Sequence, residues 1–263
     1  MNIIVCVKQV PNTTEIKIDP VTNTLIREGV ESILNPFDAY AVEEAVRMKE
    51  RYGGIVTAIC MGPNQAEETL RETVAVGVDN IILLSDRRFA GADTLATSLT
   101  LATAIKKIGD YDLIFTGQQA IDGDTGQVGP GIASHLDICQ CCFVRKIDEV
   151  NEGTITLQRL MEDGSDRLKL KLPAVISVVK EINTPRLPSL RGKRNARSVP
   201  LTVWNADDLG LDEKEIGLNG SPTQVIKIFT PKHEKKTEKY VVSPEEAADL
   251  IVKKLDEITR GAK

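Results

Sequence analysis

Residues 113–136 read LIFTGQQAIDGDTGQVGPGIASHL, and this stretch decides the fold. It opens with the apolar run 113–116, crosses a glycine-rich loop, and enters a segment in which Ile132, Ala133 and Leu136 share one helical face. A strand that leads through a loop into a helix is the repeating unit of an α/β protein. The rest of the N-terminal half repeats this unit.

Three further apolar runs, at residues 3–7, 55–60 and 81–84, have the length and β-branched character of strands. Because apolar residues occupy consecutive positions, we expect helices to cover these strands on both faces. The alternation of strand and helix predicts a doubly wound, mostly parallel sheet of Rossmann-like, adenine-nucleotide-binding type over residues 1 to about 140. A ligand is then expected beyond the C-terminal ends of the strands.

Helical patterns fill the gaps between the strands. The first helix is expected to begin with Asn35 as N-cap and Pro36 at the first position, and to end at Gly53-Gly54. The second lies between Gly62-Pro63 and Gly77, and the third begins near Ala92-Asp93. The residues expected on the inner faces are Ala41, Val42, Ala45 and Val46, then Ala66, Leu70, Thr73 and Val74, and then Leu95, Leu99 and Ala102.

The pattern changes after Cys142. Residues 155–157, 168–172 and 175–179 alternate with turn signals and predict antiparallel strands added to the core. Residues 184–198 hold five basic and no acidic residues, which indicates an exposed basic loop. Residues 199–242 are polar and turn-rich, and favour an extended C-terminal arm.

The arm is expected to end in a docking helix. Ser243-Pro244-Glu245-Glu246 is a capping box that starts this helix. Its apolar stripe comprises Ala247, Leu250, Ile251, Leu255 and Ile258. The expected divisions are therefore an α/β nucleotide-binding domain at 1–183 with antiparallel additions at 143–183, a basic loop at 184–198, and an arm with a docking helix at 199–263.

Composition limits the class of protein. The 263 residues are 41% hydrophobic and 27% charged, which is typical of a globular chain and not of a disordered one. A net charge of −5 argues against a nucleic-acid binder. No apolar run reaches the roughly 18 residues that a membrane span needs, and no basic leader precedes residues 3–7, so we expect a soluble, cytoplasmic protein without membrane insertion.

Cysteine and histidine are sparse. The five cysteines are an odd number, and Cys139, Cys141 and Cys142 are crowded together, so reduced thiols are expected. Together with His135 they resemble zinc ligands, but adjacent cysteines and a Cys-x-Cys step fit a closed tetrahedral site poorly, and no metal is expected. With only two histidines in the chain, there is little scope for histidine-based catalysis.

The glycine-rich loop, residues 117–130, is the most informative candidate site. Its glycines allow close approach to a ligand, and the amides at the start of the following helix attract phosphate. Nucleotide binding and a tight, acid-decorated turn both explain it. The chain has neither a Walker P-loop nor a GxGxxG motif after the first strand, so an ordinary nucleoside triphosphatase or Rossmann site is not supported.

Several polar residues near the same strand ends have two explanations each. Asp122 and Asp124 could bind Mg²⁺ or act as an acid/base pair, or they could cap backbone amides. Asp93, Thr94 and Thr97 could face the crevice, or Asp93 could be a plain N-cap. Lys8 could face a phosphate or a flavin edge, or it could be a solvated lysine.

Ordered motifs along almost the whole chain resemble one family, the β subunit of electron-transferring flavoproteins. The matching motifs are Cys6-Val7-Lys8-Gln9-Val10-Pro11, Asn35-Pro36-Phe37-Asp38, Met61-Gly62-Pro63, Gly91-Ala92-Asp93-Thr94, residues 119–130, Leu172-Pro173-Ala174-Val175 and Gly220-Ser221-Pro222-Thr223-Gln224. Within the family, Asp122-Gly123-Asp124-Thr125 and Gln127-Val128-Gly129-Pro130 are similar to the electron-bifurcating members.

The resemblance implies a heterodimer with an α subunit, which the C-terminal arm wraps. It implies FAD in this subunit, whereas respiratory-type members hold AMP in the same pocket. The implied activity begins with hydride transfer from NADH to this FAD. One electron then goes to ferredoxin or flavodoxin, and the other passes through the α subunit to a flavoprotein dehydrogenase of acyl-CoA or lactate type.

The resemblance also implies site residues, none of which acts as a catalytic acid or base. The cofactor contacts it implies are Cys6, Lys8, Asn35, Met61, Asp93, Thr94, Thr97, Gly117, Gln119, Ala120, Asp122, Gly123, Thr125, Gly126, Gln127 and Val128. In the basic loop it implies that Leu190 anchors the partner dehydrogenase, with Arg191, Lys193 and Arg194 as a charged rim.

Three interpretations follow. The chain is a bifurcating flavoprotein subunit, or a respiratory-type subunit with structural AMP, or a free-standing nucleotide-binding protein of the universal-stress type. The first two differ in the bound nucleotide. The third has no need of an arm or a basic loop.

Overall fold

The computed structural model describes residues 1–12, 32–226 and 237–261. The strands are β1 (Asn2–Val7), β2 (Gln9–Pro11), β3 (Ser32–Leu34), β4 (Ile55–Met61), β5 (Asn80–Leu84), β6 (Leu113–Gly117), β7 (Cys139–Asn151), β8 (Thr154–Leu160), β9 (Ser165–Lys171), β10 (Ala174–Val178) and β11 (Leu201–Trp204). The helices are α1 (Pro36–Tyr52), α2 (Glu67–Val76), α3 (Thr94–Ile108), α4 (Val128–Leu136), α5 (Leu190–Ala196), α6 (Ala206–Leu209) and α7 (Pro244–Gly261).

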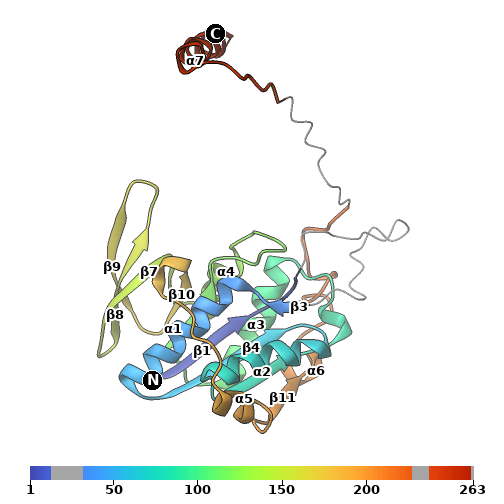
Figure 1. Cartoon of the computed structure of the whole chain (residues 1–263). Coiled ribbons are helices and arrows are strands. Elements are labelled where there is room, and N and C mark those ends of the chain that lie inside the picture. The colour runs from blue at the N-terminus through green and yellow to red at the C-terminus, as the bar shows by residue number, and fades with distance from the viewer. Residues whose placement is uncertain (13–31, 227–236, 262–263) are drawn as a thin grey trace. The chain divides into compact units, whose positions relative to one another are not determined.

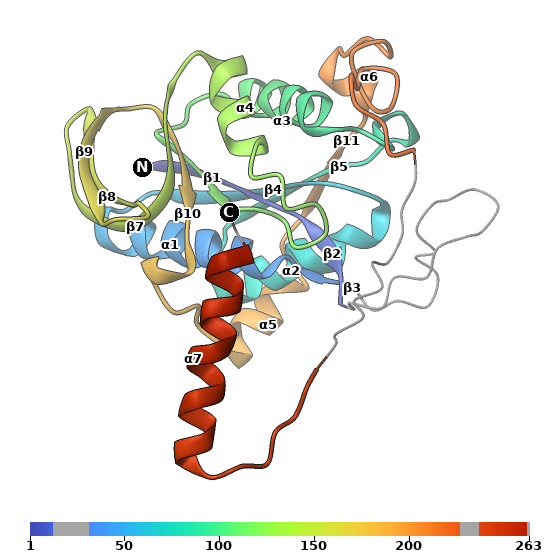
Figure 2. The same cartoon turned by 90° about the horizontal axis from the view of Figure 1, so that it is seen from above.

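Within the described residues, one large sheet has the strand order β11-β5-β4-β1-β6-β10-β7-β8-β9, and β2 pairs with β3 in a small separate sheet (Figure 1). Strand β1 pairs in parallel with β4 and β6, and β4 pairs in parallel with β5. The predicted α/β class and the mostly parallel, doubly wound sheet are therefore confirmed. The sheet lies between α1, α2 and α5 on one face and α3, α4 and α6 on the other (Figure 2).

Alternate residues of β1 build the two cores. Ile3 and Val5 pack with the side chains of α1 and α2, whereas Ile4 and Cys6 pack with those of α3 and α4. Both sets are buried, because a strand turns successive side chains to opposite faces. The four continuous apolar runs are thus explained by a sheet covered on both sides, as predicted.

The first two helices follow the sequence closely. Helix α1 has Pro36 at its start and ends at Gly53, and α2 ends at Gly77, with φ +73° and +128° at these two glycines. The predicted inner residues of both helices are buried.

For α3 the predicted inner face is partly wrong, since Leu95 is 50% exposed. The buried face instead contains small and hydroxyl-bearing residues, among them Ala96, Ser98 and Thr100. The hydroxyls of Ser98 and Thr100 bond to the backbone carbonyls of their own helix, which satisfies them inside the core.

Two corrections concern the middle of the chain. The run predicted as an antiparallel strand at 175–179 is β10, which pairs in parallel with both β6 and β7. All of its residues are buried, as expected of a central parallel strand. Strand β7, which contains the cysteine cluster, was not predicted. Strands β8 and β9 are antiparallel, as expected.

Two further corrections concern the basic loop and the arm. The loop predicted at 184–198 contains α5, which packs against α2. Residues 199–226, expected to belong to the arm, include β11, which extends the sheet in parallel beside β5, and α6. Residues 1–226 form one compact unit and 227–263 a second, and residues 227–236 lie outside the described part.

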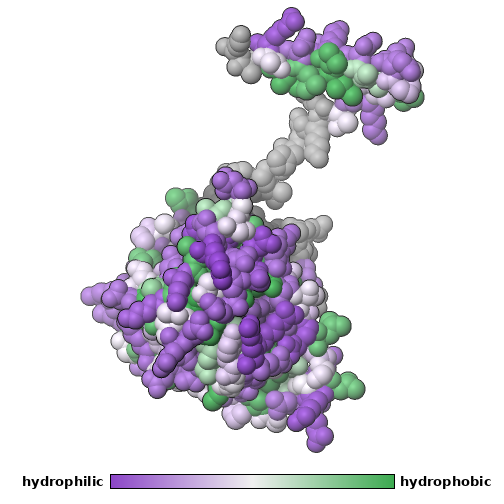
Figure 3. Space-filling model, turned by 90° about the vertical axis from the view of Figure 1, so that its left-hand side faces the viewer, coloured by the Kyte–Doolittle hydropathy of each residue, from purple (hydrophilic) through white to green (hydrophobic). Residues whose placement is uncertain are grey.

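In the second unit, the predicted capping box starts α7. The Ser243 N–H donates to the Glu246 carboxylate at 3.0 Å, and the Glu246 N–H donates to the Ser243 hydroxyl at 3.3 Å. Ile251, Leu255 and Ile258 are exposed along the helix, and Figure 3 shows the hydrophobic row that runs along α7. Among the described helices none has the length and apolar character needed to cross a membrane.

Candidate functional site

The candidate site lies at the C-terminal ends of β1 and β6, which are neighbours in the sheet. The chain leaves β1 toward α1 and β4 on one side, and leaves β6 toward α4 and β7 on the other. Loops that diverge from adjacent parallel strands flank the usual ligand position in this class of fold, and we call this place at the ends of β1 and β6 the crevice.

Asn35 joins the two sides of the crevice. Its side-chain amide donates to the Gln119 carbonyl at 2.8 Å, and its side-chain oxygen accepts from the Ile121 N–H at 3.2 Å. Asn35 occupies the N-cap position of α1, as predicted, but its side chain holds the loop after β6 and makes no capping hydrogen bond. Asn35 is 1% exposed, so both bonds are sheltered from water.

Asp38, in the first turn of α1, is a buried carboxylate under the crevice. It accepts the Lys8 N–H at 2.8 Å, which fixes the backbone as it leaves β1. Burial raises the pKa of Asp38 to about 7, although hydrogen bonds from Asn35, Lys8 and Gly117 act in the opposite direction. The sequence analysis missed this residue, although an aspartate on the face of α1 that carries Ala41 and Val42 is a signal for it.

Gly117 brings the end of β6 against this carboxylate. A Cβ at Gly117 would lie 2.4 Å from Asp38 Oδ1 and 2.7 Å from the Phe37 carbonyl carbon. Since no side chain fits in that space, glycine is required for the close approach of β6 and α1.

The two loop carboxylates are paired with side chains. Lys8 Nζ lies 2.7 Å from Asp122 Oδ1, and the Gln119 side-chain amide donates to Asp124 at 2.7 Å. Lys8 is half-exposed, so this ion pair is readily exchanged for another anion. Neither carboxylate caps a backbone amide among these contacts, so the alternative of a plain capped turn does not describe them.

The start of α4 is open. No side chain caps it in the described structure, and Gln127 precedes it in a helical conformation. Because Pro130 has no N–H, the groups at this helix start that could bind an anion are the N–H groups of Val128 and Gly129.

The start of α3 is closed by Asp93. Its carboxylate accepts the N–H groups of Leu95 and Ala96 and also the N–H and hydroxyl of Thr223, at 2.8–3.1 Å. Burial raises the pKa of Asp93, but these hydrogen bonds outweigh it and keep the pKa below its ordinary value. Asp93 is thus an N-cap that ties residues 221–223 to α3, contacts that the sequence analysis did not foresee.

The remaining predicted contacts fall into two groups. Cys6 belongs to the core on the α3 and α4 side, and Met61 packs against that core. Burial raises the pKa of the Cys6 thiol well above its ordinary value. The others lie in the loop after β6 or at the starts of α3 and α4, and they are Thr94, Thr97, Ala120, Gly123, Thr125, Gly126 and Val128.

The crevice therefore presents amide N–H groups, side-chain amides, hydroxyls and one lysine. Such donors suit a ligand with phosphates and hydrogen-bonding rings. No histidine is among the predicted contacts. Two surface hollows of about 300 Å³ lie elsewhere, and neither includes a predicted cofactor contact. Within the described residues no group of three or more His, Cys, Asp or Glu side chains is arranged to hold a metal ion.

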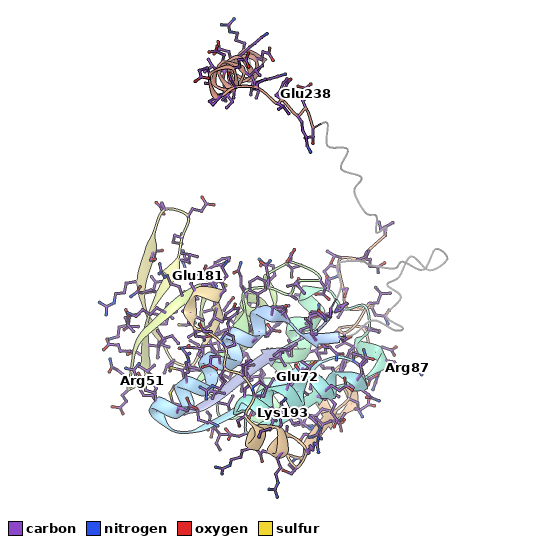
Figure 4. The ribbon with its side chains drawn as sticks, in the orientation of Figure 1. Arg51, Glu72, Arg87, Glu181, Lys193 and Glu238 are labelled. Atoms are coloured by element: carbon purple, nitrogen blue, oxygen red, sulfur yellow. The ribbon has the colours of Figure 1, made fainter. Side chains whose placement is uncertain are left out.

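The predicted partner-binding residues lie on α5. Leu190 is 88% exposed, and Arg191, Lys193 and Arg194 are exposed beside it. Figure 4 labels Lys193 on this helix.

Comparison with known proteins agrees with this architecture. The model of the electron transfer flavoprotein domain matches residues 22–209. The chain is 50% identical to the electron transfer flavoprotein subunit beta of Thermoanaerobacterium thermosaccharolyticum over 257 residues, which cover 97% of this chain and 98% of that one.

Two further relatives have other names. The caffeyl-CoA reductase-Etf complex subunit CarD of Acetobacterium woodii is 50% identical over 232 residues, 88% of each chain. Protein FixA of Sinorhizobium fredii is 46% identical over 238 residues, 88% of this chain and 84% of that one. From the family match and the near full-length similarity, the chain belongs to the electron transfer flavoprotein family, as a β subunit.

Proposed function

We propose that this electron-transfer β subunit works in a bifurcating complex in which NADH is the donor, and ferredoxin or flavodoxin and a flavoprotein dehydrogenase are the two acceptors. Membership of the family makes the chain a flavoprotein-associated subunit that pairs with an α subunit. It also favours the two flavoprotein interpretations over a free-standing nucleotide-binding protein.

The observation that carries the proposal is the loop 117–127, which Asn35 ties across the switch point of the sheet and which leads into the open start of α4. This arrangement suits a dinucleotide such as FAD. The backbone amides of Val128 and Gly129 would receive the pyrophosphate, and Lys8 could exchange Asp122 for a ligand anion.

FAD, when bound, supplies the hydride acceptance and the one-electron donation that the proposed activity needs. This chain's residues supply placement. Asn35 and Asp38 fix the loop and the backbone after β1, while Thr94, Thr97 and Thr125 offer hydroxyls near the same strand ends. The buried Cys6 shapes the floor and, with its raised pKa, is not a thiolate.

For the partner, we propose an acyl-CoA-type dehydrogenase that docks on Leu190 and its basic rim, with a lactate-type enzyme as the alternative. One relative that is 50% identical is named as a subunit of a caffeyl-CoA reductase complex, which supports the acyl-CoA type. The exposed Leu190 among three exposed basic side chains has the form of an apolar anchor with a charged rim.

Coupled electron transfer tests the proposal. The chain is co-expressed with its α subunit, and NADH-dependent reduction of ferredoxin is followed with and without the dehydrogenase and its substrate. We expect ferredoxin reduction only when the dehydrogenase turns over, with both acceptors reduced in equal electron amounts. Dehydrogenase reduction by NADH without any coupled ferredoxin reduction would contradict bifurcation.

A further inference from the structure

The segment that carries Leu190 is fastened to the body at two places. Its first part, residues 183–186, lies against α1, and its second part, α5 and the residues after it, lies against α2. Between these fastenings Leu187 and Leu190 are 90% and 88% exposed. Two exposed leucines on a short stretch held at both ends are an unusual use of apolar side chains.

The first fastening is an ion-pair network on α1. Arg186 Nε lies 2.9 Å from Glu43, and Arg186 Nη1 lies 2.6 Å from Glu50. The Arg186 N–H also donates to Glu43 at 3.1 Å, while Arg47 bonds to Glu43 and to the Thr184 carbonyl. The side chain of Glu43 is 3% exposed and that of Arg186 is 34% exposed, so this pair is partly exposed through the arginine.

The charges in this network are held ionised. Burial raises the pKa of Glu43, but hydrogen bonds from Arg186 and Arg47 outweigh it and leave the pKa below its ordinary value. The hydrogen bond from Arg186 also lowers the pKa of Glu50. Beside them Asn183 donates to Glu44 at 2.9 Å and to the Tyr40 carbonyl at 3.0 Å.

The second fastening is close packing on α2. A Cβ at Gly192 would lie 2.0 Å from the Ala75 carbonyl oxygen, so α5 rests directly on the backbone of α2. Arg71 donates to the carbonyls of Ala196 and Val199. Of the five basic residues in 184–198, Arg186 alone has an ion pair among the described contacts, which leaves the rim residues Arg191, Lys193 and Arg194 free to meet a partner.

We infer that Arg186 is a positioning residue, which holds Leu190 in its docking geometry before the dehydrogenase arrives. The inference rests on the proposed docking role of Leu190. A segment already ordered in its bound form loses less conformational entropy on association, so its partner binds more tightly. Arg186 would then act through Leu190 without contacting the partner.

The test uses the complex with the α subunit and steady-state electron transfer to the purified dehydrogenase. We expect Arg186→Gln to raise the KM for the dehydrogenase by about tenfold, with kcat and flavin content unchanged. Glu50→Gln removes only the exposed half of the network and is expected to raise KM by a smaller factor. Arg197→Gln, on the same segment but without an ion pair, is the matched control for loss of charge.

A double-mutant cycle separates positioning from contact. If Arg186 acts through Leu190, Arg186→Gln adds little to the rise in KM that Leu190→Ala already causes. Independent, multiplicative effects on KM would mean that Arg186 meets the partner directly, and would overturn the inference. Amide hydrogen exchange at residues 187–196 should be faster in Arg186→Gln, and unchanged exchange would also count against it.

The outcomes distinguish the inference from the function beneath it. If Leu190→Ala raises KM and Arg186→Gln does not, the inference fails while the docking role stands. If Leu190→Ala leaves KM unchanged, the proposed docking surface itself is wrong.

Discussion

The loop 117–127 and the segment 183–199 are both anchored on α1, and they are anchored differently. Asn35 and Asp38 hold the crevice side at the start of the helix through bonds to backbone groups. Glu43 and Glu50 hold the docking side further along through charged pairs with Arg186. One helix therefore positions both the candidate cofactor site and the candidate partner site.

The two kinds of anchor suit the different roles proposed for the two regions. Bonds from a side chain to backbone groups fix a shape and respond weakly to salt, which suits a crevice that keeps a cofactor. Partly exposed ion pairs are screened by salt and can be remade, which suits a segment that meets a partner repeatedly.

Gly117→Ala should cause the largest loss. The new Cβ would overlap Asp38 and the backbone of Phe37, so β6 and α1 must separate. We expect a loss of about 3 kcal/mol or more in the free energy of unfolding, a fall of about 10 °C in Tm, and loss of bound nucleotide. Gly164→Ala, between β8 and β9, where nothing lies within 4 Å of the added carbon, is the control and should leave both nearly unchanged.

Asn35→Ala should release the loop. It leaves the Gln119 carbonyl and the Ile121 N–H without their partner, at a total cost of about 1–2 kcal/mol. We expect faster nucleotide release, measured as the rate at which the complex loses its nucleotide on dialysis, and a modest fall in Tm. Asn64→Ala, at an exposed side chain that accepts from Ser85, should not change release. Equal release in both variants would show that Asn35 does not hold the site.

Asp38→Asn should change how stability depends on pH. The folded pKa of about 7 lies above the ordinary value, so Asp38 binds its proton more tightly in the folded state. Its contribution is fully present below the unfolded pKa and is lost as pH rises toward and through 7. Urea unfolding from pH 4 to 8 should therefore show a decline in the parent that the variant lacks; parallel curves would contradict it.

Salt should loosen the docking segment more than the crevice, and this is the smallest effect that we expect. Raising ionic strength from about 0.05 to 0.5 M screens the Arg186 network, which is worth about 1 kcal/mol or less where it is exposed. Hydrogen exchange should speed up at residues 187–196 and stay constant at residues 118–121, which Asn35 holds through uncharged bonds. An equal response in both regions would remove the contrast.

Much of the fold was predictable because its signals are local. Continuous apolar runs identified β1, β4, β5 and β6, and the caps at Pro36, Gly53 and Gly77 identified the ends of two helices. Strand β10 carries the same apolar signal, but its neighbours along the chain suggested an antiparallel hairpin, and only the folded sheet places it between β6 and β7. Strand β11 is short and half-exposed, so its sequence has no strong pattern.

The sequence predicted where the candidate site lies, but it did not predict most of the hydrogen bonds that shape it. The glycine-rich loop marked the crevice, whereas the bonds that shape it join residues about 85 positions apart, such as Asn35 with Gln119 and Ile121. Asp93 was expected to cap α3, but its contact with Thr223 depends on the path of the chain after β11. Long-range pairs of this kind leave no periodic trace in the sequence.

The nucleotide content of the complex tests the central claim most directly. The chain is co-purified with its α subunit, the ligands are released with acid, and FAD and AMP are counted per heterodimer. A crevice that holds the bifurcating flavin predicts two FAD and no AMP. One FAD with one AMP would contradict the account and leave this chain as a docking subunit with a structural nucleotide.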